Sequence, residues 1–217
     1  IYTLSLHDAL PILPSGQKSK LVLPDGTMVW LNGGSTLKYP NNFSDKKRNV
    51  VLDGEGYFEV TSRNGVPFTV STSAYDIIVK GTKFNVCAYD IDATSLTSLI
   101  EGKIEIDYKD ELYEVSPGEG VCINKNKGTV ESFRSDVDDS NAWIDGRIEY
   151  EKITLADFAA KLSRKYGVEV CIENNEIKCH TFRISLKNNE TLVQVLDGLQ
   201  LIIPFEYTID KDRIIIK

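Results

Sequence analysis

The chain has 217 residues, of which 41% are hydrophobic and 26% are charged, as in ordinary globular proteins. This length exceeds the roughly 100 to 200 residues of one domain and predicts two domains. The 25 basic and 32 acidic residues give a net charge of -7, which argues against nucleic acid as a partner. No apolar run approaches the roughly 20 residues that cross a bilayer, so we expect no membrane-spanning helix within it.

The first residues differ from the rest of the chain. They have no basic region and no small-residue cleavage site, so they are not expected to be a signal peptide. They show no strand or helix period, and their string SLHDALPI resembles translated sequencing-adapter sequence. We therefore expect residues 1–17 to be a non-native or disordered leader and leave them out of the functional argument.

From residue 18 to residue 133, apolar and polar residues alternate in short segments, for example around Phe84 and Val86. An alternation with period two is typical of strands. Turn signals such as Asn64-Gly65 separate the segments about every 8 to 12 residues. The pattern predicts an all-β domain of about a dozen short strands, arranged as a sandwich, a roll or a short solenoid.

An acidic segment follows at residues 134–142. It contains three aspartates and two serines and has almost no apolar side chains. Such a composition is typical of a linker. We therefore place the boundary between the two domains in this segment.

Residues 143–217 have a helical pattern that the first region lacks. Apolar residues three and four positions apart predict an amphipathic helix that begins after Thr154 and ends at Gly167. The arrangement recurs 37 residues later, with Thr191 in the place of Thr154. Strands are expected before and after each helix, followed by a final strand at the C-terminus. The pattern predicts a small α+β domain with a twofold strand-helix-strand repeat.

Groups suited to catalysis are scarce. His180 is the one histidine outside the leader, and the sequence has no nucleophile or nucleotide-binding motif. Asp53 and Glu55 lie on one side of a predicted strand, about 7 Å apart, which fits an inverting glycosidase. A solvated strand face is the simpler explanation of these acids. We expect no catalytic residues, no cofactor and no metal.

The four cysteines are too few for a disulfide-built fold and form no C-x-x-C pair. Cys171 and Cys179 belong to neighbouring predicted strands and can form a disulfide only if the strand register brings their Cα atoms within about 7 Å. The sequence does not fix this register, so a disulfide and two free thiols both stay open. His180 could add a metal ligand, but a surface histidine is the simpler interpretation, because the spacing matches no known site.

Ordered motifs resemble the periplasmic domain of FecR-type transmembrane anti-sigma regulators, especially their Bacteroidetes branch. These motifs are LPDGTMVWLNGGSTLKYPNNF from Leu23, VVLDGEGYFEV from Val50, PFTVST from Pro67 and VKGTKFNVCAYD from Val79. The resemblance extends over residues 18–217. The C-terminal repeat is similar to that branch's appended domain, which resembles the signalling domain at the N-terminus of some secretins and TonB-dependent transporters.

The resemblance implies a function as well as a fold. In that family a cytoplasmic domain holds an extracytoplasmic-function sigma factor, a membrane helix follows, and the periplasmic part receives a signal from an outer-membrane transporter. This chain would then be the periplasmic sensor part of a protein anchored in the inner membrane. It would reach the sigma factor and the membrane only through segments outside the sequence. The expected partner is the signalling domain of a TonB-dependent transporter, and the family has no catalytic residues to carry over.

Two other functions stay open. A carbohydrate-binding module would use exposed aromatic residues, and the chain has 10 Tyr and 2 Trp, although these tyrosines are scattered: Tyr39, Tyr57, Tyr75, Tyr89 and Tyr108. A glycosidase, the less favoured alternative, would need Asp53 and Glu55 at the floor of a cleft.

For the transporter partner we predict a docking site on the terminal strand, at Arg213, Ile214, Ile215 and Ile216. A free edge of this strand would pair with an extended segment of the partner. The simpler alternative is that the strand completes the interior of a sheet.

Overall fold

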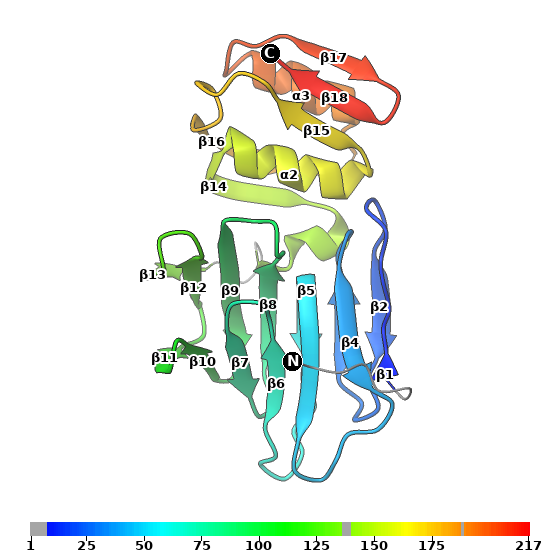
Figure 1. Cartoon of the computed structure of the whole chain (residues 1–217), viewed down its shortest axis with the longest axis vertical. Helices are drawn as coiled ribbons and strands as arrows, with labels where there is room; N and C mark the ends of the chain where they lie inside the picture. Colours follow the sequence, from blue (N-terminus) through cyan, green and yellow to red (C-terminus); the bar gives the residue numbers. More distant parts are fainter. Residues whose placement is uncertain (1–7, 136–139, 188) are drawn as a thin grey trace.

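Two hydrophobic cores organise the computed structural model, which describes residues 8–135, 140–187 and 189–217. In Figure 1 a β-sheet unit from the first part of the chain stands below a smaller unit of helices and short strands. The first core uses residues between Leu23 and Ile123, and the second uses residues between Ile148 and Ile216. The predicted linker includes residues 136–139, which lie outside the described residues, so the domain boundary stays a prediction.

The first unit is one curled sheet, with 13 strands in the described residues. Its strands are β1 (Asp8–Ala9), β2 (Ser19–Val22), β3 (Met28–Leu31), β4 (Thr36–Pro40), β5 (Arg48–Glu59), β6 (Phe68–Ser71), β7 (Asp76–Val79), β8 (Lys83–Ala88), β9 (Thr94–Glu101), β10 (Ile104–Tyr108), β11 (Glu111–Val115), β12 (Glu119–Asn124) and β13 (Thr129–Arg134). The main order is β11-β10-β7-β6-β5-β8-β9-β12-β13. The all-β prediction for this region is confirmed.

Strand β5 lets the sheet change direction. Its first half, up to Asp53, pairs with β4 and β6, and its second half pairs with β3 and β8. At the transition Gly54 has a φ of 134°, and a Cβ there would lie 2.3 Å from the hydroxyl oxygen of Ser35. A glycine is therefore required where the strand passes from one half of the sheet to the other.

A charged pair lies inside the first core. The guanidinium of Arg48 donates to Asp25 Oδ2 at 2.9 Å, and both side chains are fully buried. Arg48 also donates to the backbone oxygens of Thr61 and Val66, each at 2.6 Å. These bonds offset the cost of burying the charges, because a buried ion needs both a partner and hydrogen bonds.

Residues 8–17 are part of the fold, so the disordered alternative for the leader does not hold for them, and their non-native origin stays a prediction. Strand β1 pairs with β4, and Asp8 forms an ion pair with Lys38 at 3.2 Å. Leu13 packs against the first core and donates its backbone N–H to Ser35 O at 2.9 Å. A single two-residue strand is too short to show a period, which is why the sequence pattern missed it. Residues 1–7 lie outside the described residues.

The second unit has the predicted twofold repeat. Its elements are the 3-10 helix η1 (Ala142–Asp145), β14 (Ile148–Thr154), α2 (Leu155–Tyr166), β15 (Glu169–Ile172), β16 (Thr181–Leu186), α3 (Leu192–Gln200), β17 (Tyr207–Asp210) and β18 (Arg213–Ile216). Thr154 and Thr191 cap the two helices, as predicted, by accepting the backbone N–H of the residue three positions on. Within the described residues no helix is long and apolar enough to cross a membrane.

Strand β18 lies in the centre of a three-stranded sheet, parallel to β15 and antiparallel to β17. Ile214 and Ile216 belong to the second core and are each 1% exposed. Arg213 and Ile215 point to the opposite face, where Arg213 is exposed and Ile215 is half-buried. The predicted free edge on Arg213–Ile216 is therefore wrong, because both neighbours of the strand are present. The contact of Ile215 with a partner stays a prediction.

Candidate functional site at the junction of the two units

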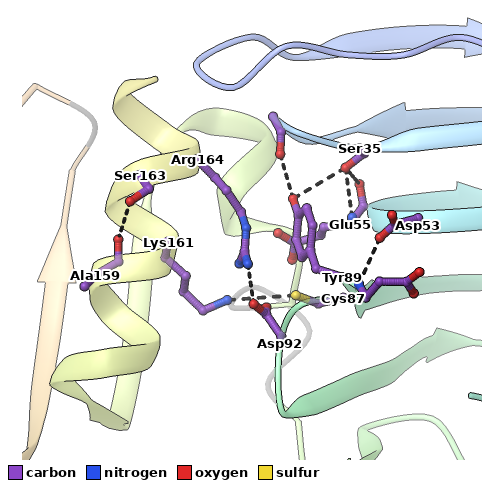
Figure 2. Close-up of polar contacts among 12 residues, drawn as sticks. Ser35, Asp53, Glu55, Cys87, Tyr89, Asp92, Ala159, Lys161, Ser163 and Arg164 are labelled. Atoms are coloured by element: carbon purple, nitrogen blue, oxygen red, sulfur yellow. Dashed lines mark hydrogen bonds and ion pairs between the residues drawn. The ribbon is translucent and has the colours of Figure 1, made fainter. Parts of the chain in front are cut away.

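Helix α2 joins the second unit to the first through polar and aromatic contacts (Figure 2). The helix contributes Lys161 and Arg164, which lie three residues apart and so share one face of the helix. The first unit contributes residues at and just beyond the end of β8, among them Tyr89 and Asp92. The junction therefore brings together side chains about seventy residues apart in sequence, such as Arg164 and Asp92, whose separation is 72.

Arg164 makes three kinds of contact with the first unit. Its guanidinium forms an ion pair with Asp92, and its Cζ lies 3.7 Å from the ring centroid of Tyr89. Its backbone oxygen accepts a hydrogen bond from Gly16 N at 2.7 Å. Burial acts to lower the pKa of Arg164, but the hydrogen bond and the charge of Asp92 raise it overall. The guanidinium is therefore a permanent cation on an aromatic face.

Tyr89 forms a rigid platform for that guanidinium. It is 4% exposed, and its hydroxyl donates to Gly33 O at 2.8 Å. Burial raises the pKa of the phenol, so the hydroxyl stays protonated and continues to donate. A Cβ on Gly33 would lie 2.7 Å from Arg164 O. The backbones of the two units therefore come so close here that only a residue without a Cβ fits at position 33.

A second chain of hydrogen bonds joins the units through η1. Trp143 Nε1 donates to Asn85 Oδ1 at 2.9 Å, and Asn85 Nδ2 donates to Glu55 Oε1 at 3.2 Å. Asn32 Nδ2 donates to the other oxygen of Glu55 at 2.8 Å. Glu55 is only 7% exposed, so the two amides satisfy a buried carboxylate. They give Glu55 a structural role.

The two acids considered for a glycosidase do not share a cleft. Asp53 is exposed and accepts a hydrogen bond from Asp90 N at 2.9 Å, whereas Glu55 is buried. The two side chains separate because the backbone turns at Gly54, between them. Of the two acids, Glu55 alone lines the cavity at the junction. The arrangement does not fit the pair of facing carboxyl groups that glycoside hydrolysis requires.

Lys161 and Cys87 meet at the same junction. Lys161 Nζ lies 4.0 Å from Cys87 Sγ and 4.9 Å from the ring centroid of Tyr150. Burial, together with the nearby Glu55 carboxylate, raises the pKa of the Cys87 thiol to about 12. The thiol is therefore neutral at physiological pH and unsuited to act as a nucleophile.

A cavity of about 510 Å³ opens beside these contacts. Its charged lining is mostly basic, although the chain as a whole carries a net charge of -7. The basic residues are Lys18, Arg134, Arg147, Lys152, Lys161, Arg164 and Lys165, and the acidic ones are Glu55, Glu149 and Glu151. Burial and the charge of Lys165 lower the pKa of Lys18. The lining disfavours cations, and the described residues contain no cluster of three or more metal-ligating side chains.

The structure also bears on two alternatives left open by the sequence, a carbohydrate-binding module and a disulfide. Four of the tyrosines considered as a sugar platform are buried, with exposures between 4% and 6%: Tyr57, Tyr75, Tyr89 and Tyr108. Buried rings cannot stack on a sugar, so they do not form the platform of a carbohydrate-binding module.

Cys171 and Cys179 are free thiols, as are Cys87 and Cys122, so the disulfide alternative is not realised.

Comparison with known proteins assigns a family to both units. A family model described as FecR protein matches residues 13–105, and a model described as FecR, C-terminal matches residues 147–216. Two crystal structures of a candidate anti-sigma factor from Parabacteroides distasonis, at 2.50 and 1.65 Å resolution, match with TM-scores of 0.91 and 0.92. Each is 28% identical to this chain, and the match covers 96% of this chain and 98% of the other. No curated protein matches. The two family models together cover well over half of the sequence, and the chain belongs to the FecR family of anti-sigma regulators.

Proposed function

We propose that this chain is the periplasmic part of an anti-sigma regulator that receives a signal and relays it. The signal would come from the signalling domain of a TonB-dependent outer-membrane transporter. It would pass to an extracytoplasmic-function sigma factor through a membrane helix and a cytoplasmic domain outside this sequence. Membership of the FecR family supports the regulatory role. The similarity of the second unit to transporter signalling domains, noted in the sequence, supports the choice of partner.

The junction at Arg164 is the observation that carries this proposal. A relay requires that the unit which binds the partner be connected mechanically to the unit which transmits the signal. The ion pair with Asp92, the stacking on Tyr89 and the backbone bond to Gly16 supply such a connection. A partner that prefers one arrangement of these contacts would shift the equilibrium between arrangements by its difference in affinity.

The chemistry of the junction supports binding rather than hydrolysis. The buried carboxylate of Glu55 is occupied by two amides, and the thiol of Cys87 is held neutral by burial. Glu55 therefore has a structural role, and Cys87 is not activated as a nucleophile. They do not offer the charged, accessible atoms that a hydrolytic reaction needs.

A pull-down with purified proteins tests the proposal. The tagged chain is mixed with purified signalling domains of TonB-dependent transporters from the same genome, and retention is measured. We expect at least one signalling domain to be retained. The matched control is the same transporter without its signalling domain, which should not bind. A glycan array run in parallel tests the carbohydrate alternative, and binding to glycans without binding to any signalling domain would contradict the proposal.

A further inference from the structure

Two cavities adjoin at the junction, and their linings differ in charge. The first is the mostly basic cavity of about 510 Å³ described above, which we call the junction cavity. The second has a volume of about 620 Å³ and shares part of its lining with the first, including Leu96 and Lys161. Its charged side chains are balanced: Asp92, Glu131 and Asp157 against Lys127, Lys152 and Lys161. Of the two, the junction cavity is therefore the one with an excess of positive charge.

The acidic side chains of the junction cavity do not cancel this excess. Glu151 forms its ion pair with Arg183, which lies outside the lining, just as Arg164 pairs with Asp92. Glu55 and Glu149 are the acids that remain. Within the described residues, the remaining basic side chains of the lining outnumber these two carboxylates.

Lys161 is a cation inside the junction without a carboxylate partner. It takes part in none of the ion pairs among the described residues. Burial acts to lower its pKa, but its interactions with Cys87, Tyr150 and Glu55 raise the pKa well above its usual value, so it stays protonated. The two groups in contact with its Nζ, the thiol of Cys87 and the ring of Tyr150, are neutral. A cation withdrawn from water gains from a counter-charge and from hydrogen bonds, which a bound anion supplies.

Lys18 adds a second cation, from the first unit. It lines the cavity, is exposed to solvent and donates a long hydrogen bond of 3.4 Å to Ile144 O. Burial of part of its side chain and the charge of Lys165 lower the pKa of Lys18, which shows that the cations of the lining repel one another. Glu55 attracts both Lys18 and Lys161, but a single carboxylate balances the charge of one of them. An additional anion would relieve the repulsion.

Apolar side chains from both units form much of the remaining lining: Leu96, Phe133, Trp143, Ile148 and Tyr150. Two of the rings are held in place. A Cβ on Gly120 would lie 2.4 Å from Phe133 Cζ, so the ring of Phe133 packs directly on the backbone of Gly120. The indole of Trp143 is fixed by its hydrogen bond to Asn85. The cavity therefore offers preformed aromatic surfaces as well as cations.

This combination selects the chemistry of a ligand. The volume lies within the roughly 300 to 1,000 Å³ of small-molecule sites, which are mostly apolar with a few polar groups that fix the orientation. A cationic ligand would be repelled by the lining. A neutral apolar ligand would leave Lys161 without a counter-charge, and an inorganic anion would leave the aromatic surfaces exposed to water. A ligand with both an aromatic body and a negative charge satisfies both parts of the lining.

We propose that the junction cavity binds a small aromatic carboxylate. Its carboxylate pairs with Lys161 and is attracted by Lys18, and its ring packs on Trp143 and Phe133. Because the ligand contacts both units, its binding strengthens the connection between them. The inference concerns a ligand other than the transporter, so it does not rest on the proposed function.

Calorimetry with three compounds tests the ligand chemistry. Naphthoate has the aromatic body and the carboxylate, naphthamide has the same body without the charge, and inorganic phosphate has charge without an apolar body. We expect naphthoate to bind the unaltered chain about tenfold or more tightly than naphthamide, as expected for a charge-assisted hydrogen bond. Phosphate should also bind more weakly than naphthoate, and high salt should weaken the binding of naphthoate more than that of naphthamide.

Substitution of Lys161 tests the location. Lys161→Met removes the charge and keeps an unbranched side chain, so naphthoate should bind about tenfold more weakly while naphthamide binds as before. Lys20→Met is the matched control. Lys20 is exposed, does not line the cavity and lies over the ring of Trp30, so this variant changes the net charge equally and should bind naphthoate like the unaltered chain.

Two measurements keep the test decisive if Lys161→Met does not fold. Lys18→Met alters an exposed side chain and should also weaken the binding of naphthoate, by a smaller factor. In nuclear magnetic resonance spectra of the unaltered chain, naphthoate should shift the indole N–H signal of Trp143 and leave that of Trp30 in place, with the two signals assigned through Trp30→Phe.

Each outcome supports or overturns the inference. Equal binding of naphthoate and naphthamide overturns the anion site, and so does the absence of naphthoate binding to the unaltered chain. A shift of Trp30 in place of Trp143, or lysine variants that all bind like Lys20→Met, overturns the location. None of these results affects the binding of a transporter signalling domain, which the pull-down measures separately.

Discussion

Replacing Arg164 by alanine should loosen the connection between the two units. The side chains of Arg164 and Asp92 are 10% and 21% exposed, so solvent screens their attraction only partly. An ion pair at this depth contributes more than the roughly 0 to 1 kcal/mol of a surface pair, and stacking on an aromatic ring adds about 0.5 to 2 kcal/mol. We therefore expect Arg164→Ala to lower the free energy of unfolding by about 2 to 4 kcal/mol.

Urea denaturation measures this loss, followed by circular dichroism and by tryptophan fluorescence. Trp143 lies in the junction and Trp30 lies in β3, so the fluorescence reports on the junction together with the first unit. The matched control is Arg183→Ala. Arg183 pairs with Glu151 at 2.8 Å, but these side chains are 67% and 71% exposed, so the loss should stay below about 1 kcal/mol.

A double-mutant cycle with Asp92→Ala isolates the pairwise contribution. We expect a coupling energy of about 1 to 3 kcal/mol, because the two side chains are in direct contact and share the platform of Tyr89. The reasoning would be refuted if Arg164→Ala cost no more than Arg183→Ala, or if the cycle gave no coupling. Either result would mean that the junction contacts are as weak as an exposed pair.

Two further predictions concern backbone approach and thiol chemistry. Gly33→Ala should destabilise the chain by about 1 to 3 kcal/mol in the same assay, because its Cβ would lie 2.7 Å from a backbone oxygen of α2. Gly198→Ala is the control, since a Cβ there meets nothing within 4 Å, and the helix should gain up to about 1 kcal/mol. Cys87, with its pKa raised to about 12 by burial, should resist iodoacetamide at pH 8 while the exposed Cys179 is alkylated, as followed by mass spectrometry. Faster labelling of Cys87 than of Cys179 would contradict the buried, neutral thiol.

The twofold repeat of the second unit could be predicted because its signals are local. Thr154 and Thr191 mark the helix starts through bonds that span three residues, and Gly167 ends the first helix with a φ of 70°. Apolar stripes at helical spacing are likewise properties of a short segment. These signals do not depend on the rest of the fold, so one sequence is enough to show them.

The order of strands within a sheet could not be predicted in the same way. Strand β18 was expected to offer a free edge, but it lies between β15, more than forty positions earlier in sequence, and β17. The pairing is set by packing of Ile214 and Ile216 on the helices, which no local pattern records. In the described residues, the strand of this hairpin that lies at the edge of the sheet is β17.

The contacts between the two units could not be predicted either, because they too join residues far apart in sequence. Arg164 lies on a helix face that has the charges of an ordinary solvated surface, and its partner Asp92 lies in a distant loop. Trp143, directly after the predicted linker, takes part in this contact between the units. A large aromatic side chain outside the helical stripe needs a partner to bury it, and Asn85 supplies one.

Strand β17 and the junction lie at opposite ends of a continuous set of hydrogen-bonded contacts. Strand β17 pairs with β18, β18 pairs with β15, and Val170 of β15 bonds to Ser163 of α2, the residue before Arg164. Contiguity alone does not establish coupling, since energetic coupling has to be measured. Coupling between binding and the junction is reciprocal, so a partner that weakens the junction must bind more tightly when the junction is already broken. Arg164→Ala should therefore bind the signalling domain more tightly than the unaltered chain if the relay works by release, and more weakly if it works by tightening. Equal affinities in calorimetry would show that the partner's binding does not reach the junction.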